Sequence, residues 1–135
     1  MEELTATLIP TTNTPGAREV SAHLFTLKML DDCYSRQDQD KFLKGMQQLD
    51  DAARVSLGKS FITATAPQQE SFLQTIDNGK STDEDLKFFY TTTKRLTILA
   101  YSSSPFFLTK VQVYELVPGR FHGCVPVKQS LHPAS

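Results

Sequence analysis

The chain of 135 residues lacks tryptophan and has two cysteines, Cys33 and Cys124, which lie far apart. No CxxC pair occurs, so a zinc site is not expected. The two thiols can form one long-loop disulfide, stay reduced, or bond to another chain. No apolar run approaches the roughly 20 residues of a membrane span, and no basic and apolar secretory signal follows Met1. This start fits a cytosolic protein and, equally, an exported protein whose signal has been removed.

Neither sign of charge dominates, because 14 Lys and Arg residues stand against 15 Asp and Glu residues, which gives a net charge of −1. The basic residues form no block, so the positive surface that nucleic-acid binding requires is missing. The length suits a single domain. We therefore predict one helical domain over residues 1–135, with a frayed polar tail at 128–135.

Patterns that carry catalysis are also scarce. The sequence contains no GxGxxG, P-loop or HExxH motif. Adjacent acidic residues such as Asp50 and Asp51 diverge by about 100° on a helix, which predicts a solvated face rather than paired carboxylates. His122 lies close to Cys124, and such a pair can act as base and nucleophile, but no third orienting group is indicated. A small enzyme that uses His122 and Cys124 is the less favoured alternative.

The apolar periodicity predicts a mostly α fold, a compact bundle of about four helices with an irregular extended C-terminal arm. The helices are expected at 17–33, 35–57, 65–78 and 83–101. Thr14 is the expected N-cap of the first helix, with Pro15 in its first turn. Ser35 is expected to cap the second helix, and Gly58 to end it.

The first of these helices has a wide apolar stripe, which predicts a central position. The stripe is formed by Ala22, Phe25, Met29 and Cys33, with Val20, Leu24 and Leu27 beside it. Because free cysteine is among the most buried residue types, we expect Cys33 to be a buried thiol.

The composition of the C-terminal arm predicts a defined backbone conformation and an exposed binding surface. After one expected helical turn at 106–110 and an extended stretch at 111–116, the run VPGRFHGCVP at 117–126 combines prolines, glycines and aromatic rings. The nearby aromatic residues Phe106, Phe107, Tyr114 and Phe121 predict an apolar patch for a partner if they do not all fit the core. A free-standing helical interaction or chaperone module is one interpretation.

Several segments together resemble the gluconate 2-dehydrogenase subunit 3 family. They are TNTPGA at 12–17, DCYS at 32–35, KRLTILAY at 94–101, TK at 109–110 and VPGRFHGCVP at 117–126. They occur in the family's order and span almost the whole chain. The chain departs from the family pattern at Asn13, where the family usually has Asp, at Ala100, where it usually has Gly, and at 102–105.

The resemblance implies a non-catalytic small subunit that holds no cofactor itself. Members pair with a large flavin-bearing subunit of the glucose–methanol–choline type, which carries FAD and oxidises sugars, sugar acids or polyols. A cytochrome c subunit can take the electrons. The small subunit commonly has a twin-arginine export signal, takes its folded partner to the periplasm and helps it mature. The resemblance thus implies an export segment that preceded Met1 and was removed.

A partner interface is expected from the loop at 11–17 and from the arm at 114–127. The expected interface residues are Thr14, Pro15, Gly16, Tyr114, Pro118, Gly119, Arg120, Phe121, His122, Gly123, Cys124 and Pro126. In an oxidising compartment an exposed thiol does not stay idle, so Cys124 is the candidate for an interchain disulfide with the large subunit. The alternative is that both segments only close the helical core.

Overall fold

The computed structural model describes residues 1–78, 83–112 and 119. Its elements are α1 (Glu2–Leu8), α2 (Ala22–Cys33), α3 (Arg36–Leu57), the 3-10 turn η1 (Phe61–Thr63), α4 (Ala66–Asp77), α5 (Glu84–Ser102) and the π-helical turn η2 (Phe107–Val111). Within these residues there is no strand, and the predicted mostly α fold is confirmed.

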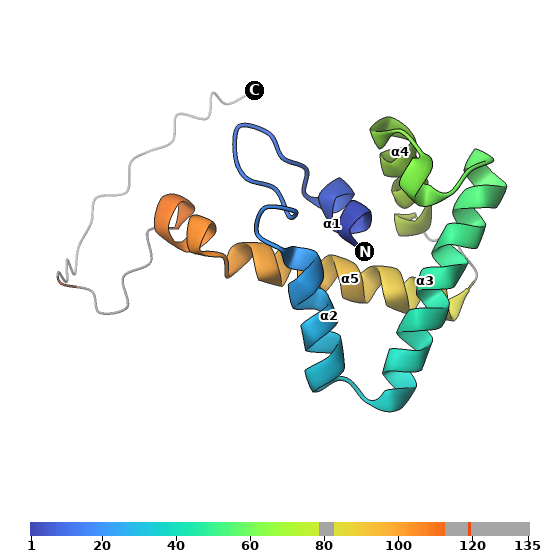
Figure 1. The fold of residues 1–135 in the computed structure, drawn as a ribbon, viewed down its shortest axis with the longest axis horizontal. Helices are drawn as coiled ribbons and strands as arrows, with labels where there is room; N and C mark the ends of the chain where they lie inside the picture. The colour runs from blue at the N-terminus through green and yellow to red at the C-terminus, as the bar shows by residue number, and fades with distance from the viewer. Residues whose placement is uncertain (79–82, 113–118, 120–135) are drawn as a thin grey trace, which may run out of the picture.

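Helix α5 is the centre of the arrangement. It runs through the middle of the molecule. Helix α2 leads from it down to the turn at 34–35, and α3 leads from that turn back up across it (Figure 1). Both helices pack extensively against it. Its buried residues are Leu86, Phe89, Tyr90, Thr92, Thr93, Leu96, Thr97 and Ala100. Leu99 on the same helix is 44% exposed.

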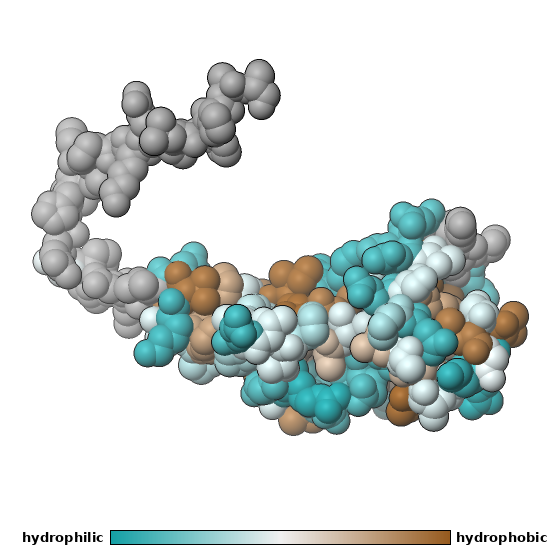
Figure 2. All heavy atoms as spheres, turned by 90° about the horizontal axis from the view of Figure 1, so that it is seen from above, coloured by the Kyte–Doolittle hydropathy of each residue, from teal (hydrophilic) through white to brown (hydrophobic). Residues whose placement is uncertain are grey.

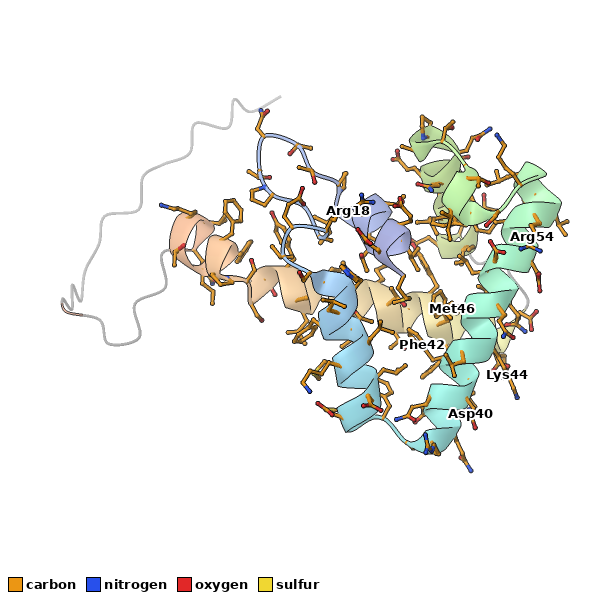
Figure 3. The ribbon with its side chains drawn as sticks, viewed as in Figure 1. Arg18, Asp40, Phe42, Lys44, Met46 and Arg54 are labelled. Carbon is orange, nitrogen blue, oxygen red and sulfur yellow. The ribbon has the colours of Figure 1, made fainter. Side chains whose placement is uncertain are left out.

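The contact between α3 and α5 is close because a glycine stands at the crossing. A Cβ atom at Gly45 would run into the carbonyl oxygen of Asp85 and lie 2.5 Å from the Cβ of Phe89. One turn earlier, Phe42 is fully buried, and its ring meets that of Phe89 edge to face at 4.7 Å. Figure 3 shows Phe42 and Met46 on the side of α3 that faces the rest of the bundle. The absence of a side chain at Gly45 lets the two backbones approach.

The predicted ends of α3 and the start of α4 are confirmed. The Ser35 hydroxyl accepts the backbone N–H of Asp38 at 3.2 Å. Gly58 adopts the left-handed conformation, with φ 70°, and donates its N–H to the Arg54 carbonyl. Thr65 opens α4 with a reciprocal capping box. These caps satisfy backbone groups that the helices leave unpaired.

The predicted apolar face of α2 is wrong in part, and α5 rather than α2 takes the central position. The helix starts at Ala22 rather than at residue 17, and Ala22, Thr26 and Leu30 are its buried positions. Leu24 is 58% exposed and Leu27 is 42% exposed, although both were expected to line the apolar stripe. Near the crossing with α5, the buried face of α2 carries the small side chains of Ala22 and Thr26. The larger Leu24 and Leu27 lie on the exposed side of the helix.

The prediction of a buried Cys33 is also wrong, because this thiol is exposed. Cys33 is the last residue of α2, at the end that extends away from α5 toward the turn into α3 (Figure 1). Cys33 follows the buried Leu30 by about one turn, but among the described residues the packing of α2 does not extend far enough to bury its side chain. The extended stretch expected at 111–116 is contradicted at Val111, which ends η2, while 113–116 lie outside the described residues.

The carboxylate of Asp50 on α3 forms hydrogen bonds with the start of η1. Oδ1 of Asp50 accepts the Ser60 hydroxyl at 2.5 Å and the Phe61 N–H at 3.2 Å, while Oδ2 is 2.8 Å from Nη2 of Arg54. These contacts, led by the Ser60 hydroxyl, hold the pKa of Asp50 below its usual value against the opposing effect of desolvation. Asp50 thereby positions the buried ring of Phe61.

Replacing Asp50 with asparagine is expected to lower the free energy of unfolding by about 1–2 kcal/mol at neutral pH, because the hydrogen bonds from Ser60 and Phe61 lose their charged acceptor and the ion pair with Arg54 is lost. Since the pKa of Asp50 is lower in the folded state, the ionised form stabilises the fold above the unfolded-state pKa of about 3.9. That contribution disappears as the pH falls through the folded-state pKa. Urea unfolding of both proteins between about pH 7 and pH 3 should show the difference shrink, and a constant difference would contradict this role.

Candidate functional site

The loop between α1 and α2 folds back on itself and on the end of α5. The N–H of Ala17 donates to the Ile9 carbonyl at 2.9 Å, and the Tyr101 hydroxyl donates to the Pro15 carbonyl at 3.0 Å. A Cβ atom at Gly16 would lie 2.6 Å from the backbone nitrogen of Thr11. Only glycine fits there, so the chain crosses itself at this point and fixes the loop's shape.

Glu19 closes this loop from the outside. Its carboxylate accepts the Thr11 hydroxyl, with contacts of 2.7 and 2.9 Å to the two oxygens, and the N–H of Gly16 at 2.9 Å. The hydrogen bond from Thr11 is the largest of the effects that lower the pKa of Glu19, and the charge of Arg18 adds to them. The carboxylate is thus ionised at neutral pH.

A hollow of about 500 Å³ lies between this loop, the start of α2 and the end of α5. Its apolar walls are formed by Pro15, Val20, Phe25, Ala100, Pro105 and Phe106. Hydroxyl side chains of Ser21, Ser103 and Ser104 interrupt them, and Glu19 is the charged residue of the lining. This size is within the range of about 300–1,000 Å³ of sites for ligands.

The surface around this end of the molecule is correspondingly apolar. On the face shown in Figure 2, apolar side chains gather at the η2 end, at the left of both views, among polar ones. Clustering of this kind marks sites for partners more often than single exposed apolar residues do.

Ser21 has a strained backbone at the edge of the hollow. Its φ of 53° makes it the one residue other than glycine with a positive φ among the described residues. It is the N-cap of α2, yet its side chain makes no capping hydrogen bond. A serine in this conformation costs on the order of 1 kcal/mol or more, and strain of this kind is often kept where a site needs it.

Tyr101 joins the loop to the last described turn. Besides its hydrogen bond to Pro15, its ring packs edge to face on Phe107, with the centroids 5.9 Å apart. Replacing Tyr101 with phenylalanine should keep the ring contact and lose the hydrogen bond. We expect the free energy of unfolding to fall by about 1 kcal/mol. Urea denaturation would measure this, and an unchanged midpoint would show that the loop does not depend on the bond.

The structure brings together part of the predicted interface. Pro15 lines the hollow and Gly16 shapes its loop, but Thr14 is exposed and does not cap α2, because the helix begins after Ser21. Gly119 is exposed. The remaining predicted residues lie outside the described part, so their role stays a prediction: Tyr114, Pro118, Arg120, Phe121, His122, Gly123, Cys124 and Pro126.

Sequence reasoning missed other residues of this site. Glu19 and Ser21 gave no local signal, since each looks like an ordinary helical or turn residue, and Phe25 was expected on the apolar stripe of the first helix rather than in a site. The break at 102–105 was visible as a run of serines before a proline, but nothing in the sequence says that it faces the loop at 9–17. That pairing depends on the hydrogen bond between Tyr101 and Pro15, which are 86 positions apart.

Over residues 1–78 and 83–112 no group of three or more His, Cys, Asp and Glu residues is placed to hold a metal ion. None of the helices in these ranges has both the length and the apolar character to span a membrane.

Comparison with known families gives one match. The family model described as gluconate 2-dehydrogenase subunit 3 matches residues 1–119, which include every described helix and the whole hollow. No curated protein and no solved structure matches the chain.

Proposed function

The chain belongs to the gluconate 2-dehydrogenase subunit 3 family, and we propose that it is the non-catalytic small subunit of an oxidoreductase complex. The observation that carries this proposal is the family match over residues 1–119 of the 135. The family is described as a subunit of a dehydrogenase, so membership of a complex follows from the family itself.

The proposed partner is a large subunit of the glucose–methanol–choline type that carries FAD and oxidises a sugar, a sugar acid or a polyol. FAD belongs to that partner in this proposal, and no cofactor is assigned to this chain. A cytochrome c subunit is a further proposed member that would accept the electrons.

The hollow beside the loop at 9–17 is the surface we assign to the partner. Its walls combine apolar side chains such as Val20 and Phe106 with the hydroxyl of Ser21 and the carboxylate of Glu19. An apolar centre with a polar rim is typical of protein interfaces. A contribution from the arm at 114–127 and an interchain disulfide through Cys124 remain part of the proposal.

The proposed task of the chain is to bind the flavin-bearing subunit, help it mature and accompany it to the periplasm by the twin-arginine route. The test is to produce the flavin-bearing subunit with and without the full-length form of this chain, and to measure flavin content and activity in cytoplasmic and periplasmic fractions. We expect periplasmic, flavin-loaded enzyme when both are present, and cytoplasmic or flavin-poor protein when this chain is missing. Equal export and flavin loading in both cases would contradict the proposed task and favour a free-standing interaction or chaperone module.

A further inference from the structure

The charge of the hollow restricts what can occupy it. Glu19 is the charged residue of its lining. The nearest basic residue in sequence, Arg18, is held by Glu2 at 3.3 Å and by Glu3 at 2.6 Å on α1. The guanidinium of Arg18 is thus engaged with other carboxylates. An occupant that complements the hollow therefore carries a positive charge.

The carboxylate of Glu19 still has room for such a group. A carboxylate offers about four acceptor positions. The Thr11 hydroxyl and the N–H of Gly16 make three contacts with it. These two donors also hold the carboxylate in place, so a further donor would meet an oxygen that is already oriented.

The apolar walls of the hollow favour an occupant whose positive charge is carried at the end of a long apolar stem. Phe25 and Phe106 contribute aromatic rings, and Val20 and Pro105 contribute aliphatic surface. Arginine buries its methylene stem on apolar surface and stacks its planar guanidinium on aromatic rings. The hydroxyl of Ser21 can accept a further guanidinium N–H. A lysine ammonium is more strongly hydrated and matches these walls less well.

We infer that the hollow receives an arginine side chain of the catalytic subunit, with its stem between the apolar walls and its guanidinium on the carboxylate of Glu19. This inference rests on the proposed function, since it names the part of the partner that the surface recognises. Arginine is among the residues that contribute most to the binding energy of protein interfaces. The strained backbone of Ser21 is explained as well, because it places a hydroxyl at the edge of the same hollow.

The first test uses the full chain alone, labelled with nitrogen-15, and three small probes: N-acetyl-arginine methylamide, its neutral isostere N-acetyl-citrulline methylamide, and the lysine analogue. We expect the arginine probe to shift the backbone amides of residues 19–25 and 103–106, and the other two probes to shift them far less. Equal shifts with the citrulline or the lysine probe, or no shift with the arginine probe, would overturn the inference. This comparison needs no variant and so does not depend on whether a variant folds.

The second test measures the affinity of the complex. Glu19→Gln keeps the shape of the side chain and removes its charge, and we expect it to weaken binding of the flavin-bearing subunit about tenfold or more. Glu70→Gln, at an exposed position on α4, is the matched control and should leave the affinity unchanged. Ser21→Gly removes the strain of the positive φ, so this variant should stay folded. It also removes the hydroxyl at the edge of the hollow, so it should bind the flavin-bearing subunit more weakly.

The outcomes separate the two proposals. If the complex forms with equal affinity in Glu19→Gln and in the unaltered chain, the arginine site is refuted while the proposed function stands. If no flavin-bearing protein binds the unaltered chain, the proposed function fails whatever the arginine probe shows.

Discussion

Replacing Gly45 with alanine is expected to lower the free energy of unfolding by about 3 kcal/mol, which corresponds to roughly 10 °C in Tm. The added Cβ would collide with the carbonyl oxygen of Asp85 and with the Cβ of Phe89, where α3 crosses α5. Both obstacles are close to the backbone, so neither can swing aside. The helices would have to separate, and the packing of the bundle around α5 would loosen.

Gly58 provides the matched control for this change. It is also a glycine at α3, but a Cβ there would meet nothing within 4 Å. Its φ of 70° makes alanine cost only about 1 kcal/mol. Urea and thermal unfolding of both variants would compare them. If Gly45→Ala were no more destabilising than Gly58→Ala, this result would contradict the close approach of α3 and α5 at Gly45.

Replacing Phe42 with alanine is expected to cost about 4 kcal/mol of stability. The Phe42 side chain is fully buried, and its ring packs edge to face on Phe89, which is 1% exposed. Truncation removes apolar surface from the core and leaves a cavity that the crossing helices cannot fill. The loss would be a large part of the 5–15 kcal/mol that is typical of domain stability.

Leu43→Ala is the control for Phe42→Ala, since Leu43 is the next residue of α3 and is 50% exposed. We expect it to cost less than about 1 kcal/mol. A double-mutant cycle with Phe89→Ala should give a coupling energy of about 0.5–1.5 kcal/mol for the ring pair. Additive effects would mean that the rings do not pack on each other.

The parts of the fold that could be predicted are those set by local chemistry. Ser35, Gly58 and Thr65 mark helix ends through their own hydrogen bonds and backbone preferences, and the structure places ends there. The helix expected at 83–101 from the apolar periodicity also agrees with α5. A short helix such as α1 has only one buried turn, around Leu4 and Thr5, and so leaves too little periodicity to detect.

The parts that could not be predicted depend on tertiary packing. The sequence shows that Leu24 is apolar, but not that α2 would meet α5 through Ala22 and Thr26. Likewise Pro15 was expected in the first turn of the first helix, but it lies in the loop before α2, where its carbonyl accepts a hydrogen bond from the distant Tyr101. The candidate site was therefore visible only in part: the segment at 11–17 was expected to form an interface, but the hollow arises only because α5 ends beside it.

The most direct test of the central claim is native mass spectrometry of what co-purifies with the full-length chain from the periplasmic fraction, when it is produced with its neighbouring reading frames. We expect a complex that contains this chain and a flavin-bearing subunit in equal numbers, with the flavin released from the larger protein on denaturation. Recovery of this chain folded, exported and alone would contradict the claim that it is the small subunit of such an enzyme.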